Sequence, residues 1–529
     1  MTSEPTADTA RLTPDPPGAT EGASAGGKGA ASSAAELVRL SSFVLLNVGA
    51  FLLIIHYLSP ADMGWYALIN VVTNLAFVVA DLQMDKVAVR RISQGDDPEE
   101  VIGAAVGVRL VGSILATIAT QAVFMGIGLA RGEVRGDVQL AALLASSQFL
   151  GESFFVVGAI FQAQLRAYLD VVPRILYLVL RFALTLVLLE AGAPWWALFV
   201  AWVLGYAIGD AAALVLFRIK TGNHLRLRLA GTGPLVREAL TLGIASLLGM
   251  ASVQFGTVYL GVTAPSRTIA VFNAAILPIQ YLSMFGGVVA IVAFPLVSEA
   301  WAAHDMVRFG RIDAIARTGI LALFAPVCIL LFQVPLAPAM EKVFGRGYGA
   351  AARPLQLMSV ALVLVSVMIW AGFVFLSVGK PRLIIMVNLA CLIVGVASCP
   401  LVVPRFGLEG LAAVGIGATG LAMILALALS RQFTPGGFDV SGSVRLAIAC
   451  TGLWGSLEIV GRVNNNFLLL VIVGIVVYPL LVALLRVFPR TAFVGLRADD
   501  ASRSGGPRER RGVRIDGVPL EGRADRVHL

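Results

Sequence analysis

The sequence predicts an all-α polytopic membrane protein. The prediction is based on its amino-acid composition and on the pattern of its hydrophobic segments. Of the 529 residues, 58% are hydrophobic and only 14% are charged, whereas soluble domains carry about 25% charged residues. The mean hydropathy is +0.86. Apolar runs follow one another from residue 38 to residue 487, and a helix that crosses a bilayer needs about 20 such residues. These features exclude a soluble globular fold.

We expect about fourteen transmembrane helices, arranged as two lobes of six helices around a central V-shaped cavity and followed by a C-terminal helix pair. The predicted spans are 38–58, 63–84, 102–129, 138–164, 168–189, 195–217, 239–262, 268–297, 318–340, 355–378, 383–403, 410–430, 445–461 and 466–487. The segments 161–166 (FQAQLR) and 375–380 (FLSVGK) each precede a helix and then a glycine, Gly192 and Gly407, which indicates an internal repeat. Two related lobes are typical of transporters whose path lies at the lobe interface.

Composition and charge divide the chain further. Residues 1–34 are rich in Ala, Gly, Ser, Thr and Pro and are predicted to be a disordered cytoplasmic tail. The N-lobe is expected at 35–217, a basic cytoplasmic linker at 218–237, the C-lobe at 238–430 and the final helix pair at 431–487. Residues 488–529 are predicted to be a disordered basic cytoplasmic tail.

The charge pattern indicates the orientation and argues against several other functions. Lys and Arg are more frequent in alternate loops, which places both termini in the cytoplasm of a multi-pass protein of the cytoplasmic membrane. The same bias accounts for most of the net charge of +8, so the charge gives no support for a nucleic-acid partner. The four cysteines fall in apolar runs and the four histidines are scattered, so neither a metal site nor a cofactor is indicated.

The chain is organised around the segment from Ile54 to Ile92. Ser59-Pro60-Ala61-Asp62 supplies helix-stopping and capping chemistry, and Gly64 is expected to let the chain fold back. Trp65 and Tyr66 are predicted at a membrane–water boundary. Asn70, Asn74 and Asp81 share one face of the second helix, so that face should meet protein or a watery cavity rather than lipid.

Several short motifs occur in a fixed order along the chain. The first are YLSPADMGWYAL at 57–68, ADL at 80–82 and RRI at 90–92. The second half adds FPLVSEA at 294–300, VFGRGYGAA at 343–351, VGKP at 378–381 and VPRFGLEGLAA at 403–413. In this order and spacing, over residues 35–435, the chain resembles the polysaccharide exporters, the lipid-linked oligosaccharide flippases of the multidrug/oligosaccharidyl-lipid/polysaccharide (MOP) superfamily. Many exporters stop at twelve helices and the related lipid II flippases have fourteen, which leaves the subfamily open.

The resemblance implies a non-enzymatic transporter that moves a polyprenyl-diphosphate-linked oligosaccharide across the cytoplasmic membrane by alternating access. Its expected partners are the lipid-linked glycan, membrane lipid and polysaccharide polymerases or glycosyltransferases. A cation-coupled multidrug antiporter of the same superfamily is the nearest alternative. A membrane-embedded polymerase or glycosyltransferase is a further one, although no long outer loop or nucleotide-sugar domain is present. The glycine-rich segment GTGP at 231–234 lacks the Lys-Ser/Thr ending of a P-loop, so ATP use is not indicated.

Ionisable side chains at membrane depth are costly, and those present are the best site candidates. They concentrate in the N-lobe, and the predicted C-lobe spans hold no charged residue. One interpretation is a cationic vestibule whose guanidiniums contact the diphosphate. The other is that Glu152–Arg181 and Asp210–Arg174 are structural ion pairs, and both stay open at this point. The candidate substrate-binding residues are Asn70, Asn74, Asp81, Arg109, Glu152, Arg174, Tyr177, Arg181, Asp210, Asn273 and Gln280.

Overall fold

A computed structural model describes residues 19–164, 166–222, 225–229, 231–433, 440–464 and 466–487. Throughout these residues the secondary structure is helical, and no strand occurs in them. The predicted tail 488–529 and residues 1–18 of the predicted tail 1–34 lie outside the described residues.

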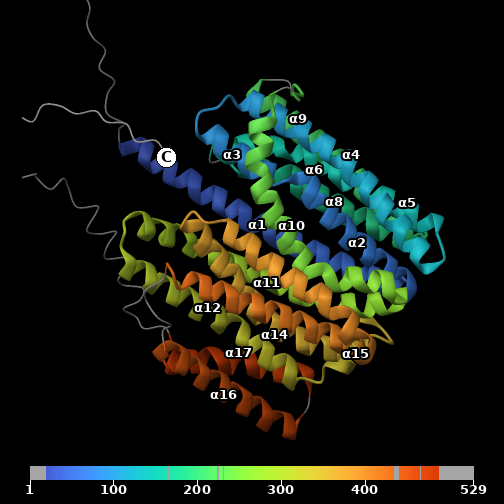
Figure 1. Ribbon diagram of the computed structural model, residues 1–529, viewed down its shortest axis with the longest axis vertical. Helices are drawn as coiled ribbons and strands as arrows, with labels where there is room; N and C mark the ends of the chain where they lie inside the picture. Colours follow the sequence, from blue (N-terminus) through green and yellow to red (C-terminus); the bar gives the residue numbers. More distant parts are fainter. Residues whose placement is uncertain are drawn as a thin grey trace, which may run out of the picture.

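The first half of the chain forms one group of helices, drawn from blue to teal in Figure 1. Helices α8 and α9 pack against each other, α1 lies along α8, and α4 lies between α2 and α6. The helices of this group are α1 (Ala19–Tyr57), α2 (Pro60–Asp81), α3 (Met84–Ser93), α4 (Pro98–Arg131), α5 (Gly136–Ala145), α6 (Ser147–Phe155), α7 (Ala159–Ala163), α8 (Tyr168–Glu190) and α9 (Leu198–Thr221). Short 3-10 turns lie at Val156–Gly158 and Trp195–Ala197.

The second half forms a second group, drawn from green to orange, with a final pair in red (Figure 1). Helix α14 is central to it, because it packs against α11, α12 and α15. The pair α16 and α17 packs on α12 at the outside of the group. These helices are α10 (Gly233–Thr263), α11 (Ser266–Ala302), α12 (Met306–Gln333), α13 (Leu336–Phe344), α14 (Ala352–Ser377), α15 (Arg382–Ser430), α16 (Val440–Val463) and α17 (Phe467–Leu484).

Within the described residues, thirteen helical segments are long and apolar enough to cross a membrane, against the fourteen predicted. The difference lies in α15, which contains both predicted spans 383–403 and 410–430. Gly407, at φ 58° and ψ −137°, interrupts the helical backbone between them. Only glycine adopts that conformation readily, and a Cβ at Gly410 would stand 3.1 Å from the Val402 carbonyl oxygen, eight residues earlier. The chain therefore turns back tightly at Gly407, between the two predicted spans.

The structure differs from the sequence prediction at two other helices. Helix α1 begins at Ala19, inside the predicted disordered tail, because no proline lies between Pro17 and Pro60 and an established helix can extend residue by residue. Helix α12 ends at Gln333, two residues before Pro335, whereas the predicted span ran from 318 to 340. Helix α12 also begins at Met306, twelve residues before the predicted span. The candidate span therefore contains Asp313 and Arg317, whereas the predicted span held no charged residue.

The hairpin between α1 and α2 confirms the expected turn but not the roles of its residues. Ser59 is the N-cap of α2, and its hydroxyl accepts from the backbone N–H of Asp62 at 3.2 Å. Gly64 lies inside the helix, and a Cβ there would stand 1.8 Å from the Ser266 carbonyl oxygen. Gly64 therefore serves close approach of the two lobes rather than a reversal of the chain.

The two groups of helices meet along α2, which packs against both α10 and α11. At one end of this contact Arg131 of α4 donates to the carbonyl oxygens of Gly261 at 2.8 Å and Ala264 at 2.7 Å. Its guanidinium also lies 4.8 Å from the ring centroid of Trp65. These bonds satisfy carbonyls at the C-terminus of α10. Arg131 therefore joins the two lobes at the end of the molecule where α2 and α11 begin.

A second cross-lobe contact lies at the opposite end of α2. Arg91 of α3 approaches Glu238 of α10, with its Nε 3.2 Å from a carboxylate oxygen, and Arg90 reaches the other oxygen at 3.1 Å. The linker between the two lobes adds a contact there, because the Arg228 backbone N–H donates to the Gly103 carbonyl at 3.2 Å. Both ends of the lobe interface therefore carry polar contacts that can break and re-form.

Candidate functional site

A cavity of about 440 Å³ lies between the two lobes. Helices α1, α2, α6, α8 and α9 line it from one lobe, and α10 and α11 from the other. Its charged lining consists of three arginines and one carboxylate, Arg39, Arg174, Arg181 and Glu152. All four belong to the first lobe, and the second lobe contributes only uncharged side chains.

Arg181 is the arginine whose charge is least engaged by the protein. Its guanidinium donates to the Tyr177 hydroxyl at 2.9 Å and lies 4.1 Å from the ring centroid of Trp202. Among the described residues no carboxylate oxygen lies within 4.0 Å of it. The Glu152–Arg181 ion pair, one of the two interpretations left open by the sequence, is therefore absent from the described structure. A cation held by a hydroxyl and an aromatic face keeps its charge available for a ligand.

Arg174 is held by acidic neighbours, although not by the predicted one. Its Nε lies 3.2 Å from the carboxylate of Asp170, and its terminal nitrogen lies 3.6 Å from Glu152. Gln162 fixes Asp170 from the other side with a bond of 2.8 Å. The Asp210–Arg174 pair, the alternative interpretation of these charges, is not formed among the described residues, where Arg174 approaches Asp170 and Glu152 instead. Arg174 thus completes a network that also orients Glu152.

Aromatic side chains form the base under Arg181. The rings of Tyr177 and Tyr206 stack with centroids 4.1 Å apart, and the Tyr206 hydroxyl donates to Glu152 at 3.2 Å. The packing depends on Gly151, where a Cβ would stand 2.4 Å from the Tyr206 ring. Tyr66 lines the cavity and stacks on Phe199 at 5.1 Å. Trp65 and Tyr66 are 7% and 6% exposed, so both rings are packed inside the protein.

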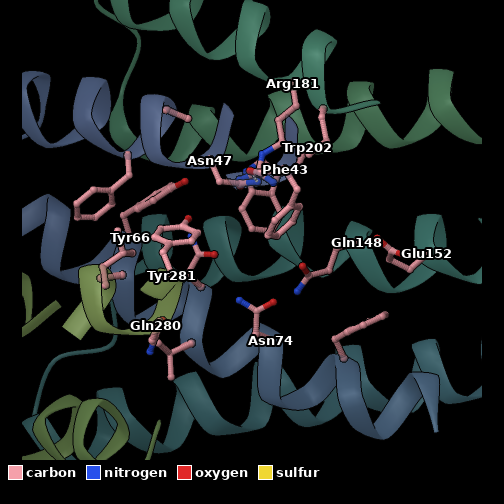
Figure 2. Close-up of a pocket in the computed structure, with 18 of the residues that line it drawn as sticks. Phe43, Asn47, Tyr66, Asn74, Gln148, Glu152, Arg181, Trp202, Gln280 and Tyr281 are labelled. Carbon is pink, nitrogen blue, oxygen red and sulfur yellow. Dashed lines mark hydrogen bonds between the residues drawn. The ribbon is translucent and has the colours of Figure 1, made fainter. Parts of the chain in front are cut away.

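Carboxamide side chains make up most of the remaining polar lining. Gln280 Nε2 donates to Gln254 Oε1 at 3.1 Å across α11 and α10. Gln148 of α6 is 5% exposed, and its amide nitrogen has no hydrogen-bond partner in the described part of the chain. Figure 2 shows Asn74, Gln148 and Gln280 across the cavity from Arg181 and Trp202. The others in the lining are Asn47, Asn70 and Asn273.

Eight of the eleven candidate residues line this one cavity. They are Asn70, Asn74, Glu152, Arg174, Tyr177, Arg181, Asn273 and Gln280. The sequence indicated these residues because they lie at similar depths in their predicted helices and on shared helix faces. Side chains at the same height of a helix bundle that point inward lie close together. Whether they bind substrate stays a proposal.

Three candidates are not among the lining residues, and we correct their assignment. Arg109 and Asp81 form an ion pair of 2.7 Å, in which Arg109 is 3% and Asp81 6% exposed. The pair joins α4 to the end of α2, so these side chains neutralise each other in the lobe core. Asp210 lies one turn beyond Tyr206 on α9, outside the lining, and its buried Oδ1 has no partner among the described residues.

Several lining residues were missed by the analysis of the sequence. Arg39, Phe43 and Asn47 follow each other at intervals of four on α1, and this stripe was the available signal. Trp202 and Tyr206 repeat the interval on α9. Tyr281 carried no signal of its own, because its place in the cavity depends on how α11 packs against α2.

Comparison with known proteins gives a family for the sequence and similar solved structures for the fold. Residues 37–301, half of the chain, match the family described as polysaccharide biosynthesis protein. The chain is a multi-pass membrane protein, and its fold is similar to the folds of solved MOP superfamily transporters. It belongs to the polysaccharide biosynthesis protein family. No curated protein matches its sequence.

The solved structures that resemble this chain include two kinds of transporter. The lipid II flippase MurJ in an inward closed conformation aligns with a TM-score of 0.65 at 13% identity, over 86% of this chain and 98% of MurJ. An inward-facing multidrug resistance MATE family transporter aligns with a TM-score of 0.58 at 16% identity, over 73% and 93%. A MOP superfamily transporter from Pyrococcus furiosus aligns at 0.55 and 15%, over 77% and 95%. At these identities the likeness is one of fold.

Proposed function

We propose that this protein moves a polyprenyl-diphosphate-linked oligosaccharide across the cytoplasmic membrane. The observation that carries the proposal is the charge of the central cavity, where three arginines accompany one carboxylate. A cation largely withdrawn from water favours an anionic partner, and the half-buried Arg181 has no carboxylate within 4.0 Å among the described residues. A diphosphate supplies that partner, because a guanidinium can donate two parallel hydrogen bonds to phosphate oxygens.

The family assignment supports a substrate from polysaccharide synthesis. In that context, the headgroup would enter the cavity while the polyprenyl chain stays in the bilayer. Alternating access would require the two ends of the lobe interface to open in turn. The Arg131 contacts and the Arg90/Arg91–Glu238 contacts lie at those two ends and can exchange partners with water. No P-loop is present in the sequence, so we propose an ion gradient or the membrane potential as the driving force.

Export of cationic drugs is the competing function, since multidrug transporters share the fold. That chemistry requires a carboxylate with spare negative charge in the cavity. Here the lining carboxylate, Glu152, lies 3.6 Å from Arg174 and accepts from Tyr206, and Asp81 is paired with Arg109. The P. furiosus transporter is itself described as having a binding pocket of reverse polarity that suggests a different function. The cationic lining therefore favours an anionic substrate.

Deletion of the gene tests the proposal in cells. We expect the deletion strain to accumulate a diphosphate-linked glycolipid on the cytoplasmic face of the membrane, and a plasmid copy of the wild type to clear it. Lipid extraction and mass spectrometry measure the accumulation, and a strain carrying the empty plasmid is the control. Unchanged glycolipid levels together with a gain in sensitivity to lipophilic cations would support the multidrug alternative and refute the proposal.

A further inference from the structure

The polar lining of the cavity is divided between two chemically different walls. The arginines all project from α1 and α8 of the first lobe. Facing them are carboxamides from α2, α6, α10 and α11, while Asn47 lies on α1 with the arginines. The lining carboxylate, Glu152, lies one turn from Gln148 on α6 and is paired with Arg174, and the second lobe contributes no charged side chain. Figure 2 shows the division, with Arg181 on one side and Asn74, Gln148 and Gln280 on the other. A single ligand that fills the cavity must therefore be anionic at one end and uncharged but hydrogen-bonding at the other.

Gln148 gives the carboxamide wall an unused donor. Its side chain is 5% exposed, and its Nε2 has no hydrogen-bond partner in the described residues. Figure 2 shows this amide directed toward Asn74. Its nitrogen is enclosed by protein, so it meets a ligand in the cavity only after a rotation of the side chain. A buried amide left without a partner destabilises the protein, because its lost bonds to water are not replaced. A ligand acceptor placed there would recover that cost.

The neighbouring carboxamides supply a matching set of donors and acceptors. The bond from Gln280 Nε2 to Gln254 Oε1 leaves the Gln254 amide nitrogen and the Gln280 amide oxygen for a ligand. The side chain of Asn74 makes no hydrogen bond to another described residue. Carboxamides both donate and accept, and so do the hydroxyl and acetamido groups of a sugar. A sugar carboxylate placed against these carboxamides would be withdrawn from water without a cationic partner, which is costly.

We infer that the carboxamide wall, Asn74, Gln148, Gln254 and Gln280, is the subsite for an uncharged sugar joined directly to the diphosphate. This inference rests on the proposed function and adds to it the class of the first sugar, a neutral hexose or N-acetylhexosamine rather than a uronic acid. The arginine wall holds the phosphates and contributes affinity for every diphosphate lipid. The carboxamide wall contributes discrimination among the sugars that the lipid carries.

The two walls can be separated by binding measurements on the purified full-length protein in lipid nanodiscs. Three probes are needed: farnesyl diphosphate, its N-acetylglucosamine conjugate and its glucuronic acid conjugate. Isothermal titration calorimetry should show the wild type binding the N-acetylglucosamine conjugate most tightly. Gln148→Met should weaken binding of that conjugate about three- to tenfold, the loss of one or two hydrogen bonds. Its affinity for farnesyl diphosphate should not change, which also shows that the variant is folded.

The control variant is Gln121→Met. Gln121 of α4 is a second glutamine whose amide nitrogen has no partner among the described residues, and it is not part of the cavity lining. This variant should bind all three probes like the wild type. Preference for the glucuronic acid conjugate, or an equal loss by Gln148→Met on all three probes, would overturn the inference alone. Failure of the wild type to bind any of the three probes would overturn the proposed function and the inference with it.

Discussion

Replacing Arg181 by glutamine should abolish transport. The variant keeps a polar side chain of similar reach but removes the charge that lies between Tyr177 and Trp202 in the cavity. Hydrogen bonds from a charged donor contribute about 1.5–3 kcal/mol, so affinity for a diphosphate lipid should fall about tenfold to a hundredfold. The measurements are clearance of the accumulated glycolipid in the deletion strain and the dissociation constant for farnesyl diphosphate.

Two further variants show whether the charge or the shape of Arg181 is responsible. Arg181→Lys keeps the charge but loses the planar fork, and it should fall between the wild type and Arg181→Gln in both measurements. Arg462→Gln removes a charge from α16, where Arg462 pairs with Glu458 and its side chain is 79% exposed. That control should transport normally. Full clearance by Arg181→Gln would remove Arg181 from the proposed site.

Replacing Arg109 by alanine should cause the largest loss of stability. Arg109 and Asp81 lie 2.7 Å apart, and their side chains are 4% and 7% exposed. Without Arg109, the Asp81 carboxylate would be buried with no opposite charge. Removing one member of a buried ion pair costs about 3–5 kcal/mol. The midpoint of thermal unfolding, followed by intrinsic fluorescence in detergent, should fall by several degrees, and the amount of protein in the membrane should fall with it.

A double substitution separates the ion pair from the space that it fills. Asp81→Asn together with Arg109→Gln removes both charges and keeps polar side chains of similar size, so it should recover most of the loss. Its binding of farnesyl diphosphate should equal that of the wild type, because neither residue is in the cavity lining. Equal stability of Arg109→Ala and the wild type would contradict the structural role. A selective loss of ligand binding in the double variant would return Arg109 to the substrate path.

The sequence predicts much of the fold because a membrane-spanning helix can be recognised from the length and hydropathy of its segment. The composition identifies the all-α membrane class, and the turn at Ser59-Pro60 is confirmed as the start of α2. The separate spans 383–403 and 410–430 were predicted from hydropathy, and the structure interrupts the helix between them at Gly407, inside the motif at 403–413. The charges of α12 were missed because Asp313 and Arg317 compensate each other one turn apart, and the Trp370 ring nitrogen donates to Asp313 at 2.8 Å.

The candidate site could be predicted only as far as depth and helical face determine it. Glu152, Arg174 and Arg181 were located in this way. The rotation of a helix about its axis determines whether a given side chain points into the cavity or into the packed core of the lobe. The side chain of Arg109 points toward Asp81. The sequence also could not predict which carboxylates pair with Arg174, which lies next to Asp170 and Glu152 rather than Asp210. These outcomes depend on the packing between helices, which spacing along one helix does not determine.

The central claim is that the cavity accepts a diphosphate rather than an organic cation. The most direct measurement is competition in nanodiscs, in which the wild type is titrated with farnesyl diphosphate and with tetraphenylphosphonium. The structure leads us to expect saturable binding of the diphosphate, reduced in Arg181→Gln, and no saturable binding of the cation. Tight binding of tetraphenylphosphonium that Arg181→Gln strengthens, with no binding of farnesyl diphosphate, would contradict it.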